Sequence, residues 1–163
     1  MYYPLTDWPI TDMILFKYIH LLAALVWVGG MFFVYVVLRP AAVATLEPPK
    51  RLVLWAGVLR IFFKWVWVAM SVILITGFYL IYLRGGIAQM PRYIHAMLAL
   101  GLTMMVVFGY MFFACYVPFS LNSAKQRWRD AGEQLNKIRK FVAANLALGL
   151  LILLVVAVGV TKG

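Results

Sequence analysis

Two histidines are the residues of this sequence best placed to do chemistry, because each lies near the start of a long apolar run. His20 belongs to the run that ends near Pro40, and His95 opens a later one. An ionisable side chain inside an apolar span is costly, so it marks a candidate functional site. Imidazole nitrogen binds metals and haem iron, and the sequence holds only these two histidines. We therefore expect His20 and His95 to face one shared site.

The elements that must position these residues are membrane helices. Of the 163 residues, 66% are hydrophobic and only 12% are charged, and the mean hydropathy is +0.94. A soluble domain of this size could not bury that much apolar surface. The formal net charge is +10, but the basic residues flank the apolar runs, which indicates anionic membrane lipid and excludes nucleic acid as the partner. No paired carboxylates, nucleophile triad or phosphate loop occurs, which excludes hydrolytic chemistry.

The apolar pattern predicts an all-α fold, an integral membrane four-helix bundle that forms one domain over residues 1–163. A Pro residue cannot continue the backbone hydrogen-bond ladder, so we expect Pro40 and Pro118 to end the first and third helices. Each span has at least the roughly 20 residues that a bilayer requires. The predicted spans are 13–38, 64–83, 92–116 and 141–160, with an interfacial helical extension over 52–63.

The basic residues predict the orientation. Eleven of the 15 Lys and Arg residues flank the first and third connections or lie on that side. The positive-inside rule places this side in the cytoplasm, so both termini lie outside (N-out/C-out) and the location is a bacterial inner membrane. These residues are Arg39, Lys50, Arg51, Arg60, Lys64, Lys125, Arg127, Arg129, Lys137, Arg139 and Lys140.

Helix geometry allows the two histidines to meet. The first and third spans run in the same direction, with His20 roughly 10 Å and His95 roughly 6 Å below their outer ends. In a four-helix bundle these spans are diagonal, roughly 11–14 Å apart, which fits a planar cofactor between two imidazoles. Haem b is such a cofactor, and bundle cores are a usual place for it. Lys17, Arg84 and Arg92 lie at the same outer end and could pair with the propionates.

Two alternatives remain open. Cu(I) prefers thioether, thiolate and imidazole ligands, and His95, Met97, Met104, Met111 and Cys115 share the third span. The seven-residue repeat of these methionines is also typical of an ordinary packing seam. In the second alternative the protein is a structural subunit whose histidines only hydrogen-bond neighbouring helices.

Small and polar residues within the spans predict helix contacts. Gly29-Gly30 in the first span and Gly101 and Gly109 in the third would let another helix approach closely. Asn145 in the fourth span is expected to hydrogen-bond across helices.

The motif of the first span, K-x-x-H-x6-W-x-G-G-x-F-F ending in L-R-P, resembles the opening helix of the CopD (copper-resistance D) membrane family. It is also similar to the opening of HemJ-type protoporphyrinogen oxidases, which read K-x-x-H and then W-x-x-G. Tyr93-Ile94-His95 resembles the W-F-H of HemJ, whereas Asn145 with Leu148-Gly149 looks CopD-like. HemJ has a lysine where this chain has Met97, and the Gly-Gly pair is closer to CopD.

The HemJ resemblance implies a four-helix haem b protein in which His20 and His95 contact the haem, and the CopD resemblance implies copper handling. Our leading hypothesis from the sequence is a membrane b-type haem protein with bis-histidine ligation. It would carry out electron transfer or an oxidoreductase reaction with a quinol or a porphyrinogen, alone or as a homo-oligomer. The alternative is a CopD-type copper uptake or homeostasis protein that uses His and Met ligands.

Overall fold

The computed structural model describes residues 8–162, and this part of the chain is helical throughout apart from short turns. Its helices form four long columns, each long and apolar enough to cross a membrane. The all-α membrane bundle predicted from the sequence is confirmed, and the orientation stays a prediction. The columns are α1 (Trp8–Phe32) with α2 (Arg39–Thr45), α3 (Pro48–Leu83), α4 (Arg92–Met111) with α5 (Val117–Ala124), and α6 (Trp128–Lys162).

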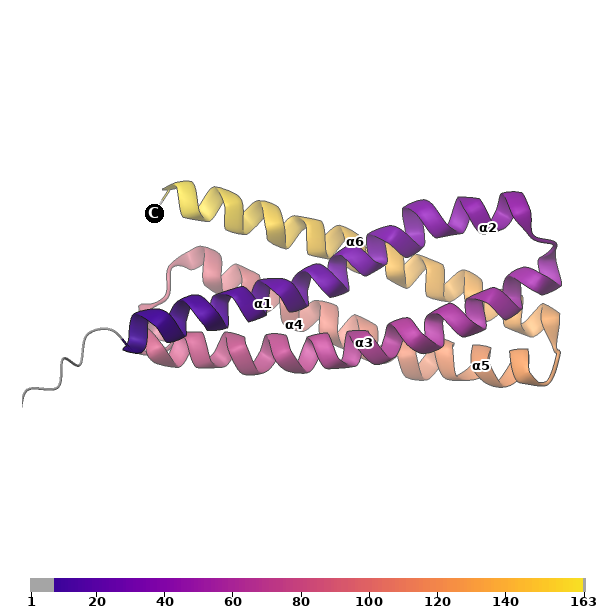
Figure 1. Cartoon of the computed structure of the whole chain (residues 1–163), viewed down its shortest axis with the longest axis horizontal. Coiled ribbons are helices and arrows are strands. Elements are labelled where there is room, and N and C mark those ends of the chain that lie inside the picture. Colours follow the sequence, from indigo (N-terminus) through magenta and orange to yellow (C-terminus); the bar gives the residue numbers. More distant parts are fainter. Residues whose placement is uncertain (1–7, 163) are drawn as a thin grey trace, which may run out of the picture.

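The columns run up and down, so that the bundle has two distinct ends (Figure 1). One end holds the turn between α2 and α3 and the turn between α5 and α6, and we call it the basic end. The other end holds the start of α1, the Gly85-Gly86 turn after α3, and the end of α6. Both glycines of that turn have positive φ, 86° and 95°, which glycine adopts without a steric penalty.

Each column is longer than a bilayer needs. The apolar stretches contain 33 to 36 residues, or roughly 50 Å of helix, against a hydrocarbon core of roughly 30 Å. The predicted spans leave most of the surplus at the basic end, where α3 runs unbroken from Pro48 through the predicted extension over 52–63. The basic end of the bundle is therefore expected to project from the hydrocarbon.

The prediction that Pro40 and Pro118 end their helices is wrong. Both prolines lie inside continuous columns, each just after a stretch of π-helix, Phe33–Leu38 and Phe112–Tyr116. In these stretches the backbone N–H of Arg39 donates to Val34 O and that of Val117 to Phe112 O, one residue farther back than in an α-helix. The wider turn accommodates a residue that lacks an N–H and crowds the preceding carbonyls, so the helix continues.

The interior is aromatic and sulfur-rich, and α1 packs mainly on α3 while α4 packs mainly on α6. Phe63 of α3 is only 1% exposed, and its ring lies against Phe108 and Tyr116 at centroid distances of 5.4 and 4.9 Å. These large rings fill the space between the α3 column and the α4–α5 column. They fix the spacing at which the other side chains of the core meet.

Glycine contacts agree with only part of the sequence prediction. A methyl group on Gly30 would overlap the ring of Phe62, so this glycine does allow α1 and α3 to pack closely. Gly101 and Gly109 have nothing within 4 Å of the position that a Cβ would occupy, and the expectation that they let another helix approach is wrong. The fourth column has close contacts at two other glycines: a Cβ on Gly149 would lie 2.9 Å from a methyl group of Val28, and a Cβ on Gly159 would overlap Tyr93.

Candidate functional site

His20 is half-buried against α3, where its ring contacts Thr76 and Gly77. Its Nδ1 lies 2.9 Å from the hydroxyl oxygen of Thr76, and a Cβ on Gly77 would lie 3.2 Å from its Cε1. The hydroxyl of Thr76 donates its own hydrogen to the carbonyl of Val72, at 2.6 Å. The Thr76 oxygen must therefore accept from His20, which places the proton of the neutral ring on Nδ1. This leaves the Nε2 lone pair free, as a metal-binding imidazole requires.

His95 lies exposed on α4, and its hydrogen bond among the described residues goes to the residue just before that helix. Its Nδ1 is 3.2 Å from the carbonyl oxygen of Pro91, the residue that precedes α4. Because a carbonyl can only accept, Nδ1 of His95 carries the proton and Nε2 is again the free nitrogen. Each histidine therefore presents a nitrogen that can bind a metal.

The structure gives the two imidazoles separate partners. His20 turns to α3, whereas His95 stays on the surface of α4, and α1 and α4 pack mainly on other helices. Lys17, Arg84 and Arg92 lie exposed at the same end of the bundle as both histidines. No group of three or more His, Cys, Asp or Glu among the described residues is arranged to hold a metal ion. Shared ligation of one group by His20 and His95 stays a prediction.

A second constellation lies deeper, where all four columns meet. Here Met31 of α1 and Met111 of α4, each 2% exposed, line one small cavity together with Trp27 and Asn145. The cavity has no room for a water molecule. It brings two methionine side chains from diagonal columns to the same part of the bundle core. The other side chains that line it are Phe62, Phe63, Val66, Phe108 and Val142.

Two polar atoms of residues that line this cavity lack a hydrogen-bond partner. The amide nitrogen of Asn145 donates to the carbonyl of Met104 at 3.1 Å, which confirms the predicted bond across helices. The Asn145 amide oxygen and the Trp27 indole N–H are both buried and unpaired. An unpaired buried polar group costs about 1–3 kcal/mol, so such groups in a native core require an explanation. An oxygen acceptor beside two thioethers is a place where a cation is less costly than elsewhere in the core.

Further buried sulfur side chains lie along the column formed by α4 and α5. Met104 lies seven residues before Met111, Cys115 lies four residues after it, and both are buried. Met70 of α3 is buried as well. The bundle core therefore contains five buried sulfur-bearing side chains from three columns. We call them the sulfur cluster: Met31, Met70, Met104, Met111 and Cys115.

Sequence reasoning missed Thr76, whose hydroxyl orients His20. The two residues are 56 positions apart and lie on different helices, so nothing in their local patterns connects them. The only signal is a hydroxyl next to a glycine, Thr76-Gly77, inside an otherwise apolar run. Small and hydroxyl-bearing residues are typical of helix contacts in membranes, and this pair could have been singled out on that ground.

Comparison with known proteins places the chain in one family of membrane proteins. The chain matches the family described as CopD, copper resistance protein D, over residues 56–159. The match spans more than half of the chain and includes Thr76, His95, Met111 and Asn145, but it begins after the first-span motif. No curated protein and no solved structure matches the chain, so the similarity to HemJ stays a prediction. The chain is a multi-pass membrane protein that belongs to the CopD family.

Proposed function

We propose that this protein handles copper in the membrane and that its cargo is Cu(I), bound between Met31 and Met111. The observation that carries the proposal is the match to copper resistance protein D over residues 56–159. It favours the copper hypothesis over the haem hypothesis that led the sequence analysis. The proposed location is a bacterial inner membrane, with the basic end of the bundle in the cytoplasm.

The chemistry of the core supports this cargo. Cu(I) is a soft ion that prefers thioether, thiolate and imidazole ligands. The sulfur cluster supplies thioethers and one thiol in the buried interior. Met31 and Met111 line one cavity from diagonal columns. Because this cavity has no room for a water molecule, the two flexible thioether side chains would have to move apart to admit the ion. The unpaired amide oxygen of Asn145 adds a dipole with its negative end in the same cavity.

His20 is the proposed entry ligand. It lies on the same face of α1 as Trp27 and Met31, because residues seven and four apart stack along a helix. Its Nε2 is free while Thr76 holds its Nδ1. Met31 lies eleven residues farther along, or roughly 16 Å toward the basic end. An ion taken up at His20 would then reach the sulfur cluster inside the bundle.

The proposal is tested with the purified protein in sealed liposomes that contain a Cu(I)-sensitive dye, under reducing conditions. Met31→Leu and Met111→Leu remove the sulfur while nearly conserving side-chain volume. We expect each to lower the initial rate of Cu(I) uptake at least tenfold. Met105→Leu is the matched control, because Met105 is only partly buried and does not line the cavity. Equal uptake by all variants, or by protein-free liposomes, would overturn the proposal.

The same preparation tests the haem hypothesis. Both histidines carry the proton on Nδ1 and leave Nε2 free, which is the tautomer an axial haem ligand needs. Bis-histidine haem b would give a Soret band that shifts on reduction and that His20→Ala and His95→Ala each abolish. Such a band would favour redox chemistry with a quinol or porphyrinogen instead of copper transfer. A colourless preparation that binds stoichiometric Cu(I) supports the copper proposal.

A further inference from the structure

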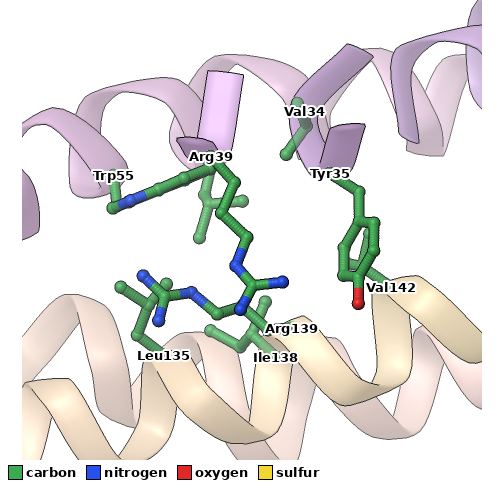
Figure 2. Close-up of a pocket in the computed structure, with 9 residues that line it drawn as sticks. Val34, Tyr35, Arg39, Trp55, Leu135, Ile138, Arg139 and Val142 are labelled. Atoms are coloured by element: carbon green, nitrogen blue, oxygen red, sulfur yellow. The ribbon is translucent and has the colours of Figure 1, made fainter. Parts of the chain in front are cut away.

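A separate pocket lies at the basic end of the bundle, between the α1–α2 column, α3 and α6. Its apolar walls include Val34, Leu59 and Ile138, and its volume is about 20 Å³, enough for about one water molecule. Two arginines from different helices, Arg39 and Arg139, complete its lining. Figure 2 shows their guanidinium groups turned toward the same space rather than away from each other.

Aromatic rings hold the two arginines in place. The Arg39 guanidinium lies 5.3 Å from the centroid of the Tyr35 ring, and the Arg139 guanidinium lies 5.9 Å from that of Trp55. Arg139 also donates to the side-chain oxygen of Asn136 at 3.1 Å. Stacking on aromatic faces is a geometry that suits arginine and leaves its N–H groups free at the edge.

The two arginines and the nearby Arg51 form a cluster of positive charge that is not paired with a carboxylate among the described residues. Arg51 of α3 lies close enough to add to the repulsion that Arg139 receives from Arg39. The ion pairs found among the described residues join Lys50 to Glu47 and Arg129 to Glu133, so none of them includes these three arginines.

The Nε of Arg139 is moreover buried and has no hydrogen-bond partner. Like charges that gather around an unpaired N–H donor are costly unless an anion joins them.

The depth of the cluster points to the source of that anion. Arg39 lies one residue beyond the predicted first span, 13–38, and Arg139 lies two residues before the predicted fourth span, 141–160. This is the level of the lipid headgroups, and Tyr35 and Trp55 are of the types that gather there. Basic pockets between membrane helices on the cytoplasmic side suit anionic headgroups, and arginine pairs with phosphate oxygens through two N–H groups.

We infer that Arg39 and Arg139 bind the phosphate group of an anionic membrane lipid at the mouth of this pocket, with the positive charge of Arg51 nearby. The pocket itself is too small for a phosphate, so the group would lie between the guanidinium edges with its acyl chains along the apolar surface of α2 and α6. The bound phosphate would offset the repulsion among the three arginines and join the α1–α2 column to α6. This inference does not depend on the proposed function.

The test is a titration of detergent-solubilised full-length protein with phosphatidylglycerol, read by native mass spectrometry as lipid bound per protein. Phosphatidylcholine serves as the zwitterionic lipid, and millimolar inorganic phosphate as the soluble source. We expect selective binding of phosphatidylglycerol, weakened about fivefold by Arg139→Gln and about 25-fold by Arg39→Gln combined with Arg139→Gln. Arg60→Gln is the matched control, because Arg60 is exposed on α3 and its substitution removes the same charge outside the cluster.

A melting measurement on the same variants guards against misfolding. With phosphatidylcholine alone, Arg139→Gln should melt at or above the wild-type temperature, because a like charge has been removed from the cluster. With phosphatidylglycerol, the wild type should gain stability and Arg139→Gln should gain little. Equal losses of binding in Arg60→Gln and Arg139→Gln, or no lipid selectivity, would overturn the inference. Full displacement of the lipid by inorganic phosphate would overturn its assignment to a lipid.

Discussion

Replacing Thr76 by valine tests whether the hydroxyl of this residue orients His20. Valine has nearly the shape of threonine, so the change removes the oxygen and little else. It deletes the 2.9 Å contact with Nδ1 of His20 and leaves this N–H without an acceptor in a half-buried position. The hydrogen bond from Thr76 to the Val72 carbonyl is lost as well, but that carbonyl keeps its place in the helix ladder.

The expected loss of stability is about 1 kcal/mol. Leaving a buried donor unpaired costs about 1–3 kcal/mol in soluble proteins, whereas hydrogen bonds between membrane helices average about 0.6 kcal/mol. The partial exposure of His20 places the value toward the lower end of the first range. The effect on metal binding should be larger, because losing the partner that orients a ligating histidine typically costs about 10- to 100-fold in affinity.

Two assays and one control separate these effects. Unfolding in mixed micelles with increasing sodium dodecyl sulfate measures stability, and competition with a Cu(I) chelator measures affinity. Thr103→Val is the matched control, because Thr103 is exposed and donates only to the Ala99 carbonyl of its own helix, at 2.9 Å. If Thr76→Val and Thr103→Val give the same stability and the same Cu(I) affinity, the orienting role of Thr76 is refuted.

Two further substitutions test the packing that holds the site. Gly149→Ala should destabilise the bundle by about 1–3 kcal/mol, since its Cβ would lie 2.9 Å from Val28, whereas Gly101→Ala has open space and should not destabilise it. Phe63→Ala should cost about 3 kcal/mol through the cavity it leaves among the core rings, and Phe78→Ala, at a position 53% exposed, should cost far less. Unfolding in sodium dodecyl sulfate measures all four variants. A Gly149→Ala variant as stable as Gly101→Ala, or a Phe63→Ala variant as stable as Phe78→Ala, would contradict the packing described here.

The membrane helices could be predicted from the sequence, because hydrophobic runs and basic flanks report directly on a bilayer. Which face of each helix points inward could not. A helix surrounded by lipid is apolar on all sides, so its pattern does not distinguish the interior from the lipid-facing surface. For that reason the sequence predicts helix contacts at Gly101 and Gly109, whereas in the structure the close contacts are at Gly30, Gly149 and Gly159.

The sequence predicts which types of ligand the candidate site contains, but not how these ligands are arranged in space. The sequence singles out His20, His95, Met104, Met111 and Cys115 as possible metal ligands. It does not reveal that Met31 and Met111 line one cavity with Trp27 and Asn145, since this depends on how four helices are rotated against one another. Contacts between distant residues, such as His20 with Thr76, likewise arise only when the helices pack.

The two π-helical stretches fix which side chains the basic end presents. A turn that closes one residue later contains one extra residue, and each residue rotates a helix by about 100°. Everything after Phe33–Leu38, including Arg39, is therefore turned by that angle relative to a regular α-helix of the same sequence. A chain with one residue fewer in this stretch could still span the bilayer, yet its Arg39 would face another direction. The register of the first column thus sets the composition of the pocket in which Arg39 meets Arg139.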